Sequence, residues 1–261
     1  MFHYGCPPMP AMSTARVVIV TGGARGIGRA IAERFLEDGA RVVVCGRNPP
    51  EIAVGDAVFV QADVREPEAA ELVVGAALQQ FGRVDVLVNN AGGSPLAEAA
   101  TASPRFSSAI VALNLLAPLN LAQRANAVMQ RQDEGGVIVN VASVSGTRPS
   151  PGTAAYGAAK AGLLNLTQSL AVEWAPRVRV NAVTPGLVRT EQAHLHYGDQ
   201  AGIAAVSATV PLGRMAEPRD VAEACFFLAS PAARYVTGAS LLVHGGGERP
   251  AFLAAANAKR G

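Results

Sequence analysis

The chain has 261 residues, of which 50% are hydrophobic and 16% are charged, and its formal net charge is +2. This composition excludes a disordered chain, and so small a charge gives no reason to expect nucleic acid or an anionic membrane as the partner. Three widely separated cysteines exclude a disulfide framework, and neither they nor the four scattered histidines form a metal-binding pattern, so we expect no metal site.

The first residues give no sign of a targeting segment. Residues 1–14 lack a basic region followed by a long apolar run, so we expect a flexible N-terminal extension and not a signal peptide. No apolar run approaches the ~20 residues of a membrane-spanning helix. We therefore expect a cytoplasmic protein without a membrane anchor.

Short valine-rich runs alternate with longer alanine-rich segments along the chain. The runs predict buried parallel strands, and the longer segments predict helices. The expected strands are 16–20, 41–45, 57–60, 84–88, 136–141, 178–183 and 240–243. The expected helices are 27–38, 66–81, 104–130, 153–174 and 220–229. This alternation predicts an α/β fold of the doubly wound Rossmann type, with a seven-stranded parallel sheet and helices on both faces. We expect one domain over residues 15–247, followed by a tail over 248–261.

The first strand leads into a glycine-rich turn, Thr21-Gly-Gly-Ala-Arg-Gly-Ile-Gly28, whose spacing is Gly-x-x-x-Gly-x-Gly. Glycines allow a tight turn and let backbone amides approach a pyrophosphate, which then lies at the N-terminus of the following helix. Because the turn follows a valine strand and opens an amphipathic helix, it predicts a dinucleotide-binding site.

Tyr156 and Lys160 are four residues apart in a predicted helix, and Ser143 lies upstream of them. Residues at this spacing share one helix face, so the lysine ammonium can lie beside the phenol. A nearby cation favours the phenolate and should lower the tyrosine pKa from its usual value of about 10. The trio therefore indicates proton transfer to or from a substrate oxygen.

Seven motifs follow one another in a fixed order: the glycine turn, Asp63-Val64, Asn89-Asn-Ala-Gly92, Asn114, Ser143, Tyr156-x-x-x-Lys160 and Pro185-Gly186. In this order and spacing, over about residues 15–247, the chain resembles the short-chain dehydrogenase/reductase family. The resemblance implies a nicotinamide-dependent oxidoreductase that acts on CH–OH groups.

The resemblance also implies roles for individual residues. Tyr156 matches the family's acid/base, and Ser143 matches the hydroxyl that polarises the substrate oxygen. Lys160 matches the residue that holds the nicotinamide ribose and lowers the tyrosine pKa. Asn114 matches the residue that keeps a water beside the lysine.

The remaining implied contacts are to the cofactor. Asp63 matches the acceptor for the adenine amino group, Val64 packs on the adenine ring, and Thr190 anchors the carboxamide together with the Val188 backbone. The full set expected at the cofactor is Gly22, Gly23, Arg25, Gly26, Ile27, Gly28, Arg47, Asp63, Val64, Asn90, Ala91, Gly92, Tyr156, Lys160, Pro185, Gly186, Val188 and Thr190.

The second strand ends in Cys45-Gly46-Arg47-Asn48, without the carboxylate that accepts hydrogen bonds from the ribose hydroxyls in NAD enzymes. A guanidinium suits the 2′-phosphate of NADP. The sequence therefore favours NADP(H), with NAD(H) as the alternative.

The expected crevice segments, 94–99, 145–152 and 187–211, carry few aromatic residues and few charges, so they favour a lipophilic ketone or secondary alcohol such as a β-ketoacyl thioester or a steroid-like ring. His194, His196 and Tyr197 are expected on a solvent-facing helix edge. His244 replaces an aspartate usual in the family, near a strand that often forms a subunit interface, and we expect a homo-oligomer, a tetramer or a dimer. The alternative of another class is a non-catalytic dinucleotide-binding redox sensor, which has no need of an intact Ser143, Tyr156 and Lys160.

Overall fold

The computed structural model describes residues 15–248, 250–251 and 255. The expected N-terminal extension and most of the expected tail lie outside the described residues. Within this part of the chain, seven parallel strands form one sheet in the order β3-β2-β1-β4-β5-β6-β7. The strands are β1 (Val17–Thr21), β2 (Arg41–Gly46), β3 (Val58–Gln61), β4 (Val86–Asn89), β5 (Gly136–Val141), β6 (Val178–Pro185) and β7 (Ser240–Val243). The fold predicted from the sequence is confirmed.

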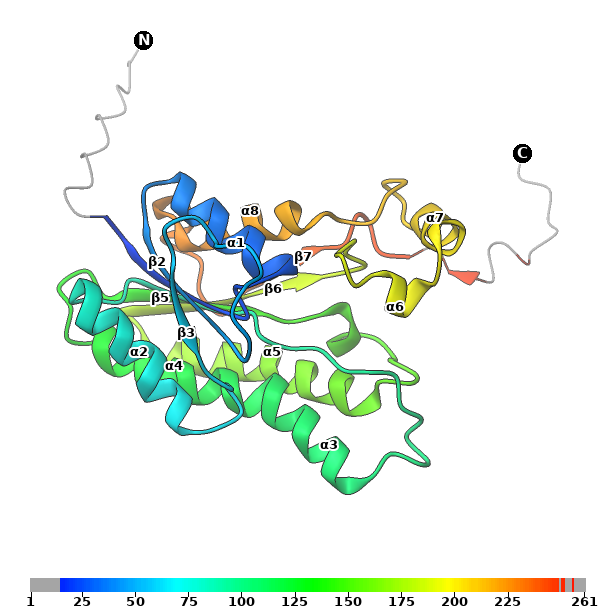
Figure 1. Ribbon diagram of the computed structural model, residues 1–261, viewed down its shortest axis with the longest axis horizontal. Helices are drawn as coiled ribbons and strands as arrows, with labels where there is room; N and C mark the ends of the chain where they lie inside the picture. The colour runs from blue at the N-terminus through cyan, green and yellow to red at the C-terminus, as the bar shows by residue number, and fades with distance from the viewer. Residues whose placement is uncertain (1–14, 249, 252–254, 256–261) are drawn as a thin grey trace, which may run out of the picture.

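Helices cover both faces of this sheet (Figure 1). The principal helices are α1 (Gly26–Glu37), α2 (Glu68–Phe81), α3 (Pro104–Val111), α4 (Ala117–Met129), α5 (Ala154–Trp174) and α8 (Pro218–Ala229). On one face α1 lies against β1 and β2 and buries Phe35, while α8 lies against β5, β6 and β7 and buries Leu228. On the other face α2, α4 and α5 bury Val73, Leu121 and Leu170. Because both faces are covered, the strands are apolar on both sides.

The segment 187–211 contains α6 (His194–Tyr197), where a helix edge was expected, and α7 (Gln200–Thr209), which the sequence did not reveal. Both lie beside the carboxyl ends of the strands (Figure 1). Asp199 caps α7 through a 2.9 Å hydrogen bond from the Gly202 amide. A small hydrophobic cluster of Ala193, Ile203 and Met215 packs α6 and α7 against the rest of the protein.

The helix expected over 104–130 is interrupted by a π-helical turn, Ala112–Leu116, between α3 and α4. Pro118 has no amide hydrogen, so the carbonyl of Asn114 loses its usual partner four residues on, and the Ala117 amide bonds instead to Ala112. The turn places Asn114 fully inside the protein.

The same segment corrects the expectation that no apolar run approaches the length of a membrane-spanning helix. Pro104–Met129 is long and apolar enough, by length and composition, to cross a membrane, although a helix of a protein core meets the same criterion. Here its residues Leu121, Ala122 and Ala125 are buried against the sheet.

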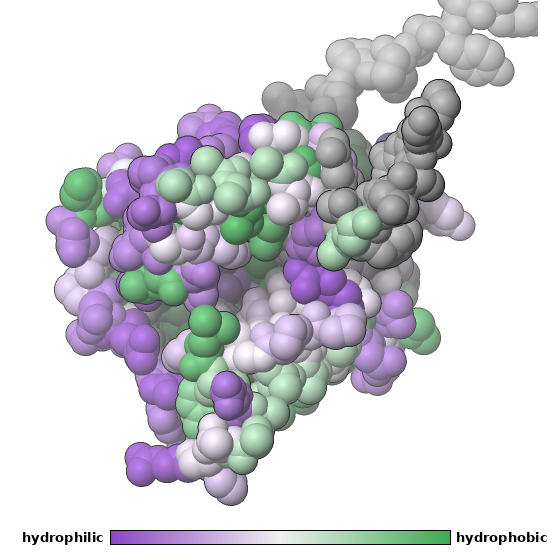
Figure 2. All heavy atoms as spheres, turned by 90° about the vertical axis from the view of Figure 1, so that its right-hand side faces the viewer, coloured by the Kyte–Doolittle hydropathy of each residue, from purple (hydrophilic) through white to green (hydrophobic). Residues whose placement is uncertain are grey.

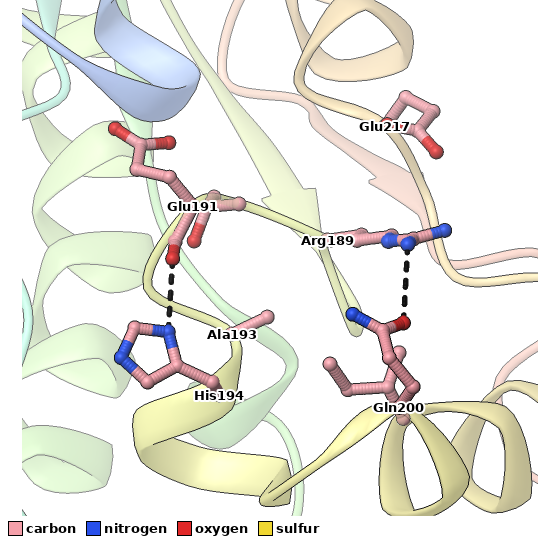
Figure 3. Close-up of a pocket in the computed structure, with 8 residues that line it drawn as sticks. Arg189, Glu191, Ala193, His194, Gln200 and Glu217 are labelled. Carbon is pink, nitrogen blue, oxygen red and sulfur yellow. Dashed lines mark hydrogen bonds between the residues drawn. The ribbon is translucent and has the colours of Figure 1, made fainter.

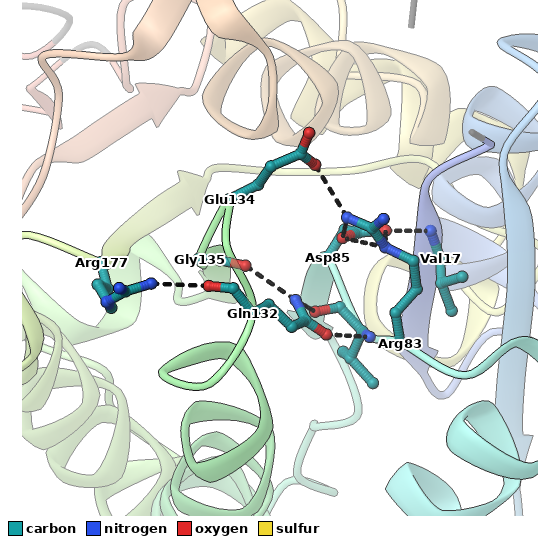
Figure 4. A network of polar contacts seen from close by, with 8 residues as sticks. Val17, Arg83, Asp85, Gln132, Glu134, Gly135 and Arg177 are labelled. Atoms are coloured by element: carbon teal, nitrogen blue, oxygen red, sulfur yellow. Dashed lines mark hydrogen bonds and ion pairs between the residues drawn. The ribbon is translucent and has the colours of Figure 1, made fainter. Parts of the chain in front are cut away.

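The amino ends of the central strands are tied together by polar contacts (Figure 4). Asp85 accepts a 2.7 Å hydrogen bond from the Val17 amide and pairs with Arg83, while Gln132 donates to the carbonyls of Val84 and Gly135. These contacts fix the end of the sheet opposite the predicted crevice. At the other end, Figure 2 shows a hollow surrounded by both hydrophobic and hydrophilic residues.

Candidate active site

The glycine-rich turn joins β1 to α1 at the carboxyl edge of the sheet. Gly22 and Gly26 have φ of +64° and +53°, values that favour glycine. A Cβ on Gly28 would lie 2.2 Å from the Gly22 carbonyl oxygen, and one on Gly23 would lie 2.5 Å from Val44. Side chains at these positions are therefore excluded, and the backbone stays open at the start of α1.

Asn90 holds this turn against the end of β4. Its side chain donates a 2.8 Å hydrogen bond to the Thr21 carbonyl, and the amides of Asn90 and Ala91 both donate to the Thr21 hydroxyl at 2.9 Å. Asn90 was predicted to line the adenosine and ribose. Its contacts give it a second role, which is to position the glycine turn.

Ser143 and Tyr156 meet through a close packing of the turn Val144–Gly146 on α5. A Cβ on Gly157 would lie 2.9 Å from the Ser145 carbonyl oxygen, and one on Gly146 would lie 2.7 Å from the Lys160 backbone. These two glycines allow the turn to approach the helix. Ser143 caps the turn, accepting a bond from the Ser145 amide, and also hydrogen-bonds to the Tyr156 phenol.

The pKa of Tyr156 departs from the expected direction. It is raised, because burial disfavours the phenolate and the nearby Tyr197 acts the same way, while the hydrogen bond from Ser143 lowers it by a smaller amount. The net shift is therefore opposite to the one expected, and the effect of Lys160 on the phenol stays a prediction. The ammonium lies 5.7 Å from the centre of the Tyr156 ring.

Lys160 is buried, and its amino group donates a 2.7 Å hydrogen bond to the Val141 carbonyl at the end of β5. Burial lowers the pKa of this lysine to about 8. The spacing of four residues puts Lys160 on the same helix face as Tyr156, as predicted.

Asn114 lies next to Lys160 across Gly92. Its side chain donates to the carbonyls of Ile110 and Gly93 and accepts from the Gly93 amide at 2.9 Å. A Cβ on Gly92 would lie 2.7 Å from the Asn114 oxygen and 3.1 Å from the Lys160 amine. The bare glycine therefore keeps the space beside both groups open.

The carboxylate of Asp63, after β3, is held by Arg65. The Arg65 Nε donates to it at 2.9 Å, and the pKa of Asp63 is lowered chiefly by this guanidinium and to a smaller extent by Arg47. Val64 is buried in the core. Sequence reasoning missed Arg65, whose two-residue spacing from Asp63 was the available signal.

The segment after β6 approaches the glycine turn. Gly186 packs on His244, since a Cβ there would lie 2.7 Å from the His244 Cβ, and Val188 pairs with Ala216 in an isolated parallel bridge. Thr190 lies near Gly26, and the Glu191 carboxylate accepts a 3.0 Å hydrogen bond from the Gly26 amide. Pro185 is buried at the end of β6.

Two cavities open at this edge. The larger, of about 490 Å³, is lined by Arg189, Thr190, Glu191, Ala193, His194, Gln200, Ile203 and Glu217 (Figure 3). The smaller, of about 270 Å³, is lined by Val144, Thr147, Arg148, Gly186, Leu187, Val210, His244, Gly247 and Glu248. An ion pair at 2.6 Å joins Arg148 to Glu248 in it, so the first residue of the expected tail is fixed to the active-site edge.

The side chains at 194–197, which were expected to face solvent, do so only in part. His194 and His196 are exposed, whereas Tyr197 is half-buried and packs on the cluster of Ala193 and Ile203. Burial and Glu248 raise the pKa of Tyr197. A short helix of four residues leaves too little periodicity to predict which side chain turns inward.

Residues 22–248 match a family model described as Enoyl-(Acyl carrier protein) reductase. L-rhamnose 1-dehydrogenase (NAD(P)(+)) of Azotobacter vinelandii is 41% identical, over 88% of this chain and 96% of that protein. The 3alpha-hydroxysteroid dehydrogenase of Mediterraneibacter gnavus is 38% identical over the same shares. An uncharacterized short-chain type dehydrogenase/reductase of Sinorhizobium fredii is 40% identical, and the match spans 43% of its length. The solved aldohexose dehydrogenase of Thermoplasma acidophilum, in ligand-free form, has 33% identity and a TM-score of 0.84, covering 89% of this chain and 93% of that one.

Proposed function

The chain belongs to the short-chain dehydrogenase/reductase family, and on that premise we propose that it uses NADP(H) to interconvert a ketone and a secondary alcohol on a lipophilic substrate. Its class is that of an NAD(P)-dependent oxidoreductase. The cofactor, the substrate and the residue roles below are our proposal.

The glycine turn fits a dinucleotide. Side chains are excluded at Gly23 and Gly28 by contacts of 2.5 and 2.2 Å, so no side chain at these two positions lies between the start of α1 and a pyrophosphate. Asp63 and Val64 would hold the adenine, Gly92 would leave room for the ribose, and Val188 and Thr190 would hold the carboxamide. When bound, the nicotinamide supplies or accepts the hydride.

Tyr156 would exchange a proton with the substrate oxygen, and Ser143 would donate a hydrogen bond to that oxygen. Lys160, whose amine lies against Gly92, would hold the ribose. Asn114 is placed to keep a water beside this amine. The observation that carries the proposal is the convergence of Ser143, Tyr156 and Lys160 at the edge where the glycine turn lies.

The preference for NADP(H) rests on the end of β2. Gly46 ends the strand and Arg47 follows, exposed, close enough to influence the pKa of Asp63. Arg25, at the start of α1, is also exposed. Two guanidinium groups without a carboxylate at the strand end favour a 2′-phosphate over a ribose diol.

A lipophilic substrate is supported by leucines exposed on the segments around the crevice. Leu96 and Leu195 within these segments, and Leu212 directly after them, are 66%, 63% and 73% exposed. The name of the hydroxysteroid dehydrogenase relative agrees with this choice.

A sugar-like substrate is the second candidate. The ion pair between Arg148 and Glu248 lines the smaller cavity and offers both donors and acceptors to a polyhydroxylated ring. The names of the rhamnose and aldohexose dehydrogenases agree with this candidate.

We also propose a cytoplasmic homo-oligomer. Phe227 in α8 and Leu242 in β7 are 42% and 51% exposed, and exposed apolar side chains on adjacent elements suit a subunit interface.

The test is a panel of steroid-like and β-ketoacyl substrates, simple secondary alcohols and aldoses, each assayed with both cofactors by nicotinamide absorbance. We expect turnover with NADP(H) on lipophilic substrates and its loss in Tyr156→Phe, which should still bind cofactor. Turnover restricted to aldoses would select the second candidate. Cofactor binding without turnover on any substrate, unchanged in Tyr156→Phe, would favour the redox sensor.

A further inference from the structure

The N-terminus of α1 carries a carboxylate from a distant part of the chain. Glu191 accepts a 3.0 Å hydrogen bond from the amide of Gly26, the first residue of α1, across 165 positions of sequence. Figure 3 shows the Glu191 side chain pointing towards the ribbon of α1, while its backbone carbonyl faces His194. Thr190 lies against the same glycine.

This helix has no acidic cap of its own. Arg25 at its N-cap makes no side-chain hydrogen bond to the helix, and its first turn contains no acidic residue. By contrast, α3 and α7 are capped by their own Ser103 and Asp199. An anion at a helix N-terminus is stabilised by the helix dipole and the free amides, so Glu191 supplies from a loop what α1 lacks.

A dinucleotide would place its pyrophosphate at the same helix end. Two negative charges cannot share one set of amide donors without repulsion, and an amide that donates to Glu191 is not free for a phosphate. We propose that Glu191 is an affinity-determining residue, an intramolecular competitor that weakens dinucleotide binding and is displaced by the cofactor. This inference rests on the proposed function, because it requires the pyrophosphate to bind at α1.

Displacement has a consequence for the substrate side of the crevice. Glu191 lies three residues before His194, where α6 begins, and it lines the larger cavity. The contact with Gly26 therefore ties the segment that leads into α6 to the glycine turn. Cofactor binding releases that tie.

A purely structural role for Glu191 makes the opposite prediction. If the carboxylate only braced the loop in its binding-competent position, removing it would weaken cofactor binding. Glu191→Gln keeps the shape and an acceptor but removes the charge, whereas Glu191→Ala removes both.

The experiment is calorimetric titration of ADP-ribose and of NADP+ into the wild type, Glu191→Gln, Glu191→Ala and the control Asp199→Asn. The control removes the same charge from the same segment and keeps a capping acceptor on α7. We expect both Glu191 variants to bind each ligand about two- to fivefold more tightly than the wild type, and the control to bind as the wild type does.

Unchanged or weaker binding by both Glu191 variants, with the wild type binding normally, would overturn this inference alone. Equally tighter binding by Asp199→Asn would also overturn the inference, because the loss of any negative charge in this segment would then be enough to strengthen cofactor binding. A wild type that binds neither ligand would instead refute the proposed function.

Discussion

The amino group of Lys160 donates a 2.7 Å hydrogen bond to the carbonyl oxygen of Val141 at the carboxyl end of β5. The bond holds the cation at the sheet edge, 5.7 Å from the centre of the Tyr156 ring. Burial lowers the pKa of Lys160 to about 8, which means that the folded protein disfavours the charge it carries at neutral pH. Such a lysine costs the fold stability, which agrees with the role proposed for it at the cofactor.

Lys160→Met should therefore abolish turnover and yet stabilise the protein at pH 7, by about 1–3 kcal/mol. The sign follows from proton binding. Below the folded-state pKa of about 8, Lys160 is protonated in both the folded and the unfolded state, and the wild type bears the full cost of burying the charge. Between that pH and the lysine's usual pKa near 10.5, only the unfolded state is protonated, so the stability of the wild type rises with pH.

The advantage of the Met variant should shrink over this window in urea unfolding at about pH 7 and about pH 9.5. Cys45 and Cys225 have raised pKa values of about 11 and about 12, so their ionisation in the unfolded state lowers the stability of both proteins in the alkaline range. This contribution is the same in the wild type and the variant and cancels from the difference between them. A difference independent of pH would contradict the depressed lysine pKa.

The glycine turn gives a matched pair of substitutions. Gly28→Ala would force a Cβ to 2.2 Å from the Gly22 carbonyl oxygen, which is backbone and cannot move away cheaply. We expect it to cost about 1–3 kcal/mol of unfolding free energy and to weaken dinucleotide binding. Gly75→Ala, in α2 with open space around it, should instead stabilise by about 0.5–1 kcal/mol. Equal effects of the two changes would contradict the steric argument.

The short apolar runs predicted all seven strands, most clearly the central ones, because a strand buried on both faces leaves a continuous apolar record; the edge strands β3 and β7 are only partly buried. The break in the helix at Asn114 was less visible, although Pro118 was a signal for it. The contact between Glu191 and Gly26 left no local pattern, since it joins positions far apart through the path of a loop. The raised pKa of Tyr156 was missed for a similar reason: sequence spacing gives the distance to Lys160 but not the burial of the phenol.

Cofactor preference can be moved at Arg47. Arg47→Asp replaces the guanidinium beside the end of β2 with a carboxylate that repels a 2′-phosphate and accepts bonds from a ribose diol. We expect kcat/KM for NADP(H) to fall at least about tenfold and that for NAD(H) to rise. Arg41→Asp makes the same change of charge at the opposite end of β2 and should leave the ratio of kcat/KM for NADP(H) to kcat/KM for NAD(H) unchanged. A ratio that moves equally in both variants would mean that net charge, not position, sets the preference.

The raised pKa of Tyr156 predicts different pH profiles for the two reaction directions. Carbonyl reduction needs the protonated phenol, which persists through neutral pH, so its kcat/KM should stay flat between about pH 6 and about pH 8.5. Alcohol oxidation needs the phenolate and should rise with pH by up to about tenfold per unit.

Ser143→Ala tests this assignment, because the Ser143 hydrogen bond is the contact that lowers the tyrosine pKa. Its removal should displace the oxidation profile to higher pH as well as reduce turnover. Loss of a merely structural cap would lower the rate at every pH without displacing the profile. An oxidation profile that is flat from about pH 6 in the wild type would mean that the phenol is already ionised, and Tyr156 would then not be the buried acid described by these contacts.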